Sequence, residues 1–216
     1  MRFFIFVLLF TVGNGYSGSE KLVIEMFSDC FSDCGHLPCG WYASQRDVEM
    51  FSVEQEEGNF FVKIRTHGGN TSFGKKFSYD IREYPFLSWR WRVHVLPVGG
   101  YEAVRETSDS GAGVYVVFRG RLRLNRVIKY VWSTKMAKGS LTESPFNSRT
   151  KIVVIRSGEG LLGEWVEQRV NVMEDYMRLF DCDSPPLVEG IGIMSDGDNT
   201  DSFVEADYDA FVVSQR

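Results

Sequence analysis

The chain has 216 residues and a formal net charge of -5 at pH 7. Apolar residues make up 44% of it and aromatic residues 14%, a composition that excludes a disordered or collagen-like chain. The acidic balance argues against nucleic acid as a partner, because binding to phosphates needs a basic patch. The length suits one all-β domain with a substantial core.

Residues 1–17 have the layout of a secretory signal peptide. Arg2 precedes an apolar run that ends at Val12, and Gly15 and Ser17 offer the small side chains that signal peptidase requires. The run is shorter than the about 20 apolar residues that span a bilayer. We therefore expect a protein exported to the periplasm or the cell exterior, with no membrane span after signal removal. Residues 18–216 would form a single domain.

The expectation of export determines how the four cysteines are interpreted. Three of them cluster near the N-terminus and one stands far downstream: Cys30, Cys34, Cys39 and Cys182. An oxidising compartment favours disulfides, with one bridge inside the cluster and one from the cluster to Cys182 as the preferred pairing. A zinc site that uses His36 and the clustered thiols is the alternative.

Segments rich in β-branched and aromatic residues, separated by Gly, Pro, Asn or Asp, predict a succession of strands. The predicted strands are 22–27, 48–54, 59–66, 76–81, 86–95, 113–118, 127–132, 151–155, 164–170, 188–194 and 203–213. One helix is predicted over residues 173–180, with Asn171 as its N-cap. The pattern indicates an all-β sandwich or barrel with one short helix.

Segment 86–95 alternates between apolar and polar side chains, so one face should lie in the core and the other outside it. The polar face carries Arg90, Arg92 and His94, which would be costly to bury without partners. This row either forms a charge ladder with acids of neighbouring strands such as Asp80, or lines a ligand groove. The side chains predicted to lie near such a groove are Tyr115, Lys129 and Trp132.

The tract 190–211 contains seven acidic or amide side chains between Asp196 and Asp209 and no Lys or Arg. It fails as an EF-hand loop, because Asp201 stands where that loop needs Gly and the flanking helices are missing. Three interpretations stay open: a cation site, a ligand rim that uses Asp198 and Asn199, or a solvated turn.

Several segments in fixed order resemble the bacterial exported family catalogued as domain of unknown function 3047. They are YPFLSWRWRV at 84–93, VYVVF at 114–118, YVWS at 130–133, NVMEDYMRLF at 171–180, and GIGIMSDGDNT with EADYDAF within 190–211. The resemblance implies a jelly-roll β-sandwich akin to galactose-binding-like and carbohydrate-binding modules. One departure is that Asp109 and then Gly113 precede VYVVF, where the family pattern has acidic residues and an Arg.

In sandwiches of that kind a bound cation usually supports the structure, so the resemblance implies a structural Ca²⁺ held by Glu25, Asp196 and Asp209. The function it implies is a noncatalytic module that binds a glycan or an envelope polymer. The alternatives are an envelope structural or assembly protein that binds another polypeptide, and, with no motif behind it, a glycan-cleaving enzyme. Glycoside hydrolysis would need two suitably spaced carboxylates in a groove.

Overall fold

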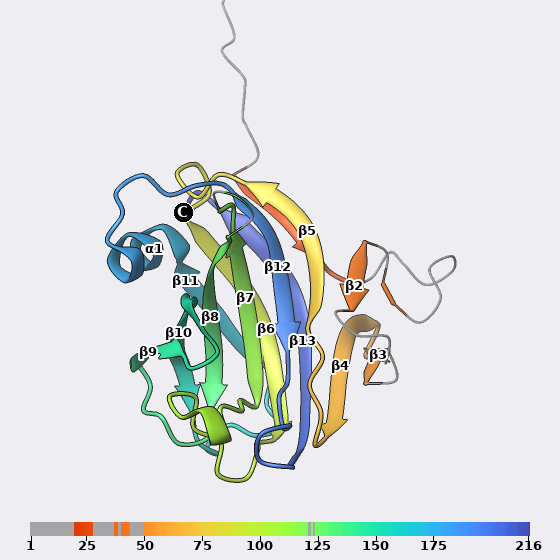
Figure 1. Cartoon of the computed structure of the whole chain (residues 1–216). Helices are drawn as coiled ribbons and strands as arrows, with labels where there is room; N and C mark the ends of the chain where they lie inside the picture. The colour runs from red at the N-terminus through yellow and green to blue at the C-terminus, as the bar shows by residue number, and fades with distance from the viewer. Residues whose placement is uncertain (1–19, 28–36, 39, 44–49, 121, 123) are drawn as a thin grey trace, which may run out of the picture.

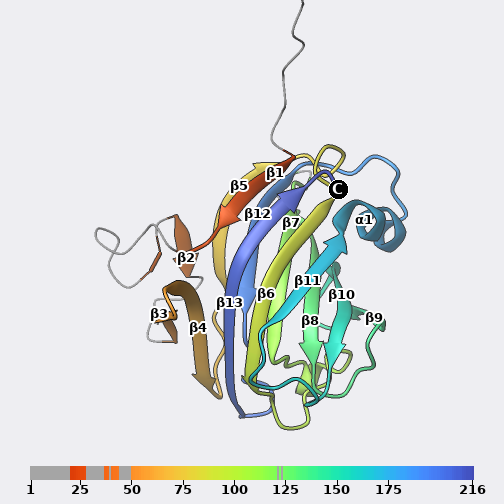
Figure 2. The ribbon, with the colours of Figure 1, turned by 180° about the vertical axis from the view of Figure 1, so that it is seen from behind.

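A computed structural model of the chain describes residues 20–27, 37–38, 40–43, 50–120, 122 and 124–216. The predicted signal peptide, residues 1–17, lies outside the described residues. Two β-sheets pack face to face, one toward the viewer in Figure 1 and the other in Figure 2. The predicted all-β sandwich with one short helix is therefore confirmed.

Sheet A is the sheet seen from the front in Figure 2. Its strands are β1 (Lys21–Glu25), β3 (Phe51–Glu56), β4 (Asn59–His67), β6 (Phe86–Val95), β11 (Val166–Asn171) and β13 (Phe203–Ser214). Their order is β11-β6-β13-β4-β3, with β1 also paired to β13. The last strand in the sequence therefore lies in the middle of this sheet, between β6 and β4.

Sheet B contains two short strands that the sequence did not predict, β2 (Trp41–Ala43) and β9 (Leu141–Ser144). Its other strands are β5 (Phe73–Tyr79), β7 (Ala112–Phe118), β8 (Arg126–Ser133), β10 (Asn147–Ser157) and β12 (Val188–Met194). The order is β2-β5-β12-β7-β8-β10-β9. Strands β8 and β10 are parallel, whereas the other recorded pairs of sheet B are antiparallel.

The core lies between the sheets and is rich in aromatic rings. Trp89 and Trp91 of β6 point inward, as the alternation predicts, and are almost fully buried. Their ring centroids lie 5.8 Å from that of Tyr130 and 6.0 Å from that of Trp132, respectively. Such tilted and edge-to-face pairs add to the stabilisation that burial provides. Trp132 is thus a core residue and its indole Nε1 donates to the carbonyl of Gly158, so it lines no groove.

The helix α1 (Val172–Phe180) begins one residue before its predicted start. Asn171 is the N-cap, as predicted, and its side chain accepts a hydrogen bond from the amide of Glu174. Tyr176 turns inward and its ring lies 4.4 Å from that of Phe118. The 3-10 helix η1 (Arg105–Thr107) precedes β7 at the opposite end of the molecule from α1 (Figure 1). Among the described residues, neither helix has the length and apolar character needed to cross a bilayer.

Candidate functional site

A groove runs across the outer face of sheet B, and its floor is made of glycines. Gly74 lies on β5, and Gly190 and Gly192 lie on the adjacent β12. A β-carbon at Gly190 would come within 2.7 Å of the carbonyl oxygen of Lys75, and one at Gly192 within 3.4 Å of Tyr115 Cβ. Because side chains are missing here, the backbone itself is open to an approaching ligand.

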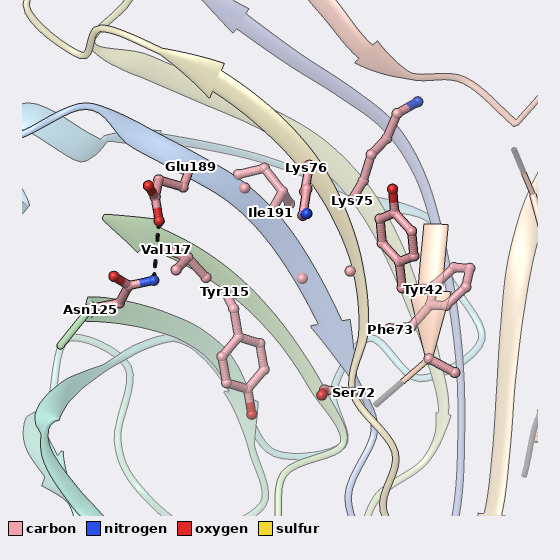
Figure 3. Close-up of a pocket in the computed structure, with 14 residues that line it drawn as sticks. Tyr42, Ser72, Phe73, Lys75, Lys76, Tyr115, Val117, Asn125, Glu189 and Ile191 are labelled. Carbon is pink, nitrogen blue, oxygen red and sulfur yellow. Dashed lines mark hydrogen bonds between the residues drawn. The ribbon is translucent and has the colours of Figure 1, made fainter. Parts of the chain in front are cut away.

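Two tyrosines stand on opposite sides of β12 (Figure 3). Tyr42 of β2 is 56% exposed, whereas Tyr115 of β7 is half-buried. The ammonium of the exposed Lys76 lies 5.9 Å from the centre of the Tyr42 ring. A hydrogen bond fixes the position of the Tyr115 ring, because its hydroxyl donates to Met194 Sδ at 3.8 Å. The groove therefore has one exposed aromatic side, Tyr42, and one half-buried, hydrogen-bonded aromatic side, Tyr115.

One end of the groove is polar. The side-chain amide of Asn125 donates to Glu189 at 3.2 Å, and Arg119 donates to the other oxygen of the same carboxylate at 2.8 Å. A register shift between Val188 and Gly190 places Glu189 at a bulge. The groove has a volume of about 430 Å³. Its chemistry combines aromatic rings, bare backbone and a few polar groups, which is the usual composition of a small-ligand site.

The predicted row Arg90, Arg92 and His94 lies on the other side of the molecule, on the outer face of sheet A. Arg90 donates two hydrogen bonds to Asp209 Oδ2, at 2.9 and 2.6 Å. Arg92 Nε and His94 Nε2 contact Asp207 Oδ2 at 2.8 and 2.7 Å. Both carboxylates are fully buried. The row therefore forms a charge ladder with β13, the first of the two alternatives that the alternation leaves open.

An aromatic cover completes this ladder. The ring centre of Trp165 lies 4.8 Å from the Arg90 guanidinium and 4.6 Å from that of Arg92. Such cation–π contacts add to the ion pairs and keep the side chains in place. Asp80, suggested as a ladder partner, instead binds Arg82 two residues away. The acids of the ladder come from β13, because β13 and not the strand before β6 pairs with β6.

The acidic tract forms a compact group of carboxylates, which we call the Asp triad: Asp109, Asp196 and Asp198. One carboxylate oxygen from each lies within 4.8 Å of the other two. Asp109 and Asp196 are buried and Asp198 is exposed. Burial raises the pKa of Asp196 to about 8; the Lys129 ammonium opposes this effect, and the carboxyls of Asp198 and Asp109 reinforce it. These oxygens could hold a metal ion.

Lys129 of β8 is buried between the Asp triad and the groove. Its ammonium lies 5.4 Å from the centre of the Tyr115 ring. Burial alone would lower the pKa of Lys129, but the Tyr115 hydroxyl and the Asp196 carboxylate outweigh it and raise the pKa above its ordinary value. Tyr115 and Lys129 were predicted to lie near the Arg90, Arg92 and His94 row, but they lie on the other sheet, where Tyr115 lines the groove and Lys129 lies beside its ring.

The structure separates the residues predicted as metal ligands. Glu25 accepts hydrogen bonds from Lys75 and from the Trp41 indole, at 2.6 and 2.8 Å, and Asp209 belongs to the ladder. Only Asp196 of the predicted set lies in the Asp triad, where Asp109 and Asp198 join it. Asn199, predicted with Asp198 as a ligand rim, donates its backbone amide to Asp109 at 3.2 Å.

Cys182 is the one predicted disulfide residue that the structure describes, and it carries a free thiol. Its Sγ donates to the carbonyl of Ser184 at 3.6 Å. The other three cysteines, Cys30, Cys34 and Cys39, lie outside the described residues. A bridge inside that cluster stays a prediction.

Sequence reasoning missed most of the groove. Tyr42 lies on a strand of three residues, too short to show alternation. The glycines were available as a signal, because GxG at 190–192 places two glycines inside a predicted strand and such glycines mark close backbone approach. Their significance becomes apparent only when β5 and β12 pair side by side.

The fold and the groove together define a two-sheet β-sandwich with an open groove on one outer face. The chain belongs to the family described as "Protein of unknown function (DUF3047)", which matches residues 41–212. This confirms the resemblance drawn from the sequence motifs. A comparison with curated proteins finds no match.

Several solved structures have a similar arrangement of strands. The family 30 carbohydrate-binding module of the cellulosomal cellulase Cel9D-Cel44B of Clostridium thermocellum is 11% identical with a TM-score of 0.47, over 90% of this chain and 98% of the module. The family 11 module of that organism, in complex with a β-1,3-1,4-mixed-linked tetrasaccharide, is 8% identical with a TM-score of 0.43, over 90% and 95%. The family 11 xylanase from Neocallimastix patriciarum is 11% identical with a TM-score of 0.41, over 90% and 99%. At these values the likeness carries no inference about a ligand or an activity.

Proposed function

We propose that this protein binds a glycan, or a similar polymer of the cell envelope, in the groove of sheet B. The observation that carries the proposal is the pair of tyrosines, Tyr42 and Tyr115, on either side of a glycine floor (Figure 3). Flat aromatic rings complement the apolar faces of sugar rings, while their hydroxyls reach polar partners. The proposed site differs from the one predicted on sheet A, whose cationic side chains are already bound to buried carboxylates.

The size and shape of the groove support a short stretch of polymer as the ligand. A volume of about 430 Å³ lies within the range of about 300–1,000 Å³ that small-ligand sites occupy. The glycine floor lets a sugar ring come against the backbone of β5 and β12, where side chains would otherwise hold it away. The groove is open at the surface, so a longer chain could continue beyond it.

Polar groups at the rim suit hydroxyl recognition. Asn125 and Glu189 offer donors and acceptors at one end, and the exposed Lys76 offers an ammonium near Tyr42. Both charge signs are present, which favours a neutral or weakly acidic glycan over a strongly charged one. Among the described residues, Glu189 is the only carboxylate that lines the groove. Hydrolysis by a pair of carboxylates would have no second acid there, so binding without cleavage is the favoured form of the proposal.

Export to the periplasm or the cell exterior also belongs to this proposal. The support is the signal-like layout of residues 1–17, and a glycan ligand of the envelope would lie in the same compartment. The structural Ca²⁺ predicted from the sequence would have a supporting part in such a module, since binding alone requires no catalytic metal.

Binding to a glycan array, followed by calorimetry with the best oligosaccharide, tests the proposal. Tyr42→Ala removes the exposed ring and should lower affinity by roughly tenfold, a loss of about 1.4 kcal/mol. Tyr101→Ala is the matched control, because Tyr101 is also partly exposed and does not line the groove. Equal losses in the two variants would reject the groove. Capture of a polypeptide from polysaccharide-digested extracts, without any array signal, would favour the assembly-protein alternative.

A further inference from the structure

Three loops of the sandwich meet at the Asp triad. Asp109 lies in the loop between η1 and β7, and Asp196 and Asp198 lie in the turn between β12 and β13. The third loop joins β4 to β5 and contains Gly69. Backbone hydrogen bonds bring the loops together: Asp196 N donates to Ser110 O at 3.1 Å, and Gly197 N to Gly69 O at 3.4 Å. We infer that the Asp triad binds a hard divalent cation, Ca²⁺ in preference to others, and that the ion links these loops.

The first reason is the state of Asp196. It is 5% exposed, and its Oδ1 has no hydrogen-bond partner. A buried oxygen without a hydrogen-bond partner is costly, and ionisation of Asp196 beside two further carboxylates adds repulsion. A cation among the three groups would remove both penalties at once. An ordinary solvated acidic turn would instead have left the carboxylate in water.

The second reason is that the other two carboxylates are held in place. Asp109 accepts hydrogen bonds from Asn199 N at 3.2 Å, from Thr200 N at 2.7 Å and from Thr200 Oγ1 at 2.6 Å. Asp198 Oδ2 accepts from Asn70 Nδ2 at 2.5 Å. A carboxylate offers about four acceptor positions, so each group keeps capacity for an ion. Such fixed ligands lower the entropy lost on binding.

The chemistry of the ligands selects the class of ion. All three are carboxylate oxygens, a ligand set that suits hard cations, whereas structural Zn²⁺ sites are built mainly from Cys sulfur and His nitrogen. An ion with bonds of about 2.4 Å to oxygen can bridge atoms up to about 4.8 Å apart, and the triad oxygens lie within that distance of one another. Mg²⁺ usually keeps several waters and is held by one or two carboxylates, whereas Ca²⁺ accepts more protein oxygens, so three carboxylates favour Ca²⁺. Asp198 is exposed, so water can reach the ion and fill its remaining positions.

Lys129 limits the affinity of the Asp triad for a cation. Its buried ammonium already balances part of the charge of the triad, and Asp196 is one of the acids that act on it. An incoming ion therefore meets a site with less than its full negative charge. Replacing Lys129 by Met should therefore raise the affinity of the Asp triad for Ca²⁺. If Lys129 only stabilised the fold, its replacement would not raise that affinity.

Calorimetric titration of the purified protein with CaCl₂ and with MgCl₂, together with thermal unfolding in Ca²⁺ or chelator, tests the inference. One Ca²⁺ per chain should bind, and saturating Ca²⁺ should raise Tm by roughly 5 °C or more. Asp198→Asn, at an exposed position that should not disturb folding, should weaken Ca²⁺ binding at least tenfold. Asp196→Asn should abolish it. Asp183→Asn, at an exposed acid after α1, is the control and should behave as wild type.

Two results would overturn the inference. One is the absence of Ca²⁺ binding to the folded wild-type protein, and the other is binding that Asp198→Asn and Asp196→Asn leave unchanged. The measurement uses the ion alone, without a glycan. Failure of the glycan proposal would therefore leave the result on the cation site intact, and the reverse also holds.

Discussion

Gly190 and Gly192 shape the outer face of sheet B in different ways. A Cβ at Gly190 would collide with the backbone of β5, so the close pairing of β5 and β12 itself requires glycine there. A Cβ at Gly192 would make only ordinary contact with Tyr115, at 3.4 Å. Gly190 is therefore required by strand pairing, whereas the missing side chain of Gly192 leaves space in the groove.

Glu25 gives a pH-dependent contribution to stability at the scale of a single residue. Burial alone would raise the pKa of its carboxyl, but hydrogen bonds from Lys75, Trp41 and Phe27 outweigh burial and hold the pKa below its ordinary value of 4.5. The unfolded chain therefore binds this proton at higher pH than the folded protein does. The stabilisation is complete above pH 4.5 and is lost as the pH falls through the folded pKa.

Glu25→Gln should accordingly lower the free energy of unfolding at pH 7 by roughly 2 kcal/mol, because it removes the charge that accepts hydrogen bonds from Lys75, Trp41 and Phe27. The difference from wild type should shrink below pH 4.5. Urea unfolding at a series of pH values measures both. Glu20→Gln is the control, since Glu20 forms only an exposed pair with Arg216. A difference that stays constant down to pH 3 would contradict the pKa argument.

At the scale of elements, the ladder between β6 and β13 holds the centre of sheet A. Alternation along β6 predicted which side chains face outward, and that prediction is confirmed. It could not identify their partners, because strand order is a property of the whole sheet and β13 lies more than 100 residues away in the sequence. The same limit explains why the structure separates the residues that were predicted as metal ligands. Glu25 and Asp209 are acids on strands that do pair, yet each carboxylate already has other donors.

Asp209→Asn should destabilise the protein by removing the charge that faces Arg90. The Arg90 side chain is 28% exposed, so solvent reduces the penalty and the expected loss is about 2 kcal/mol. Chemical denaturation measures it. Asp80→Asn, which breaks an exposed ion pair with Arg82, should change stability little. A loss that is equal in the two variants would show that burial of the Asp209 carboxylate does not matter.

At the scale of the whole molecule, the fold class could be predicted from the sequence. Runs of β-branched and aromatic residues identified most of the strands, and the cap at Asn171 identified α1. The strands β2 and β9 were not predicted, because three or four residues are too few to show the alternation of a strand. The groove escaped for a related reason: its walls come from β2 and β7, which meet across sheet B only after β5 and β12 have paired between them.

Removal of residues 203–216 should prevent folding of the whole sandwich. Strand β13 pairs with β1, β4 and β6, so its loss leaves three strands of sheet A without their partner and uncovers the core. The truncated chain should be degraded by protease under conditions in which the full chain resists. Removal of residues 215–216 alone is the control and should leave resistance intact. A resistant core in the longer truncation would indicate that sheet B folds independently.

The central position of β13 also has a consequence for synthesis. Sheet A cannot close until residues 203–214 have left the ribosome, because β6 and β4 flank the strand that those residues form. At about 5–20 residues per second, the nascent chain spends tens of seconds without its native sheet. During that time the side chains of Arg90 and Arg92 on β6 lack the β13 carboxylates that pair with them. Until then the edges of β4 and β6 that face β13 have no hydrogen-bonding partner, and unpaired edges of this kind favour pairing with other chains.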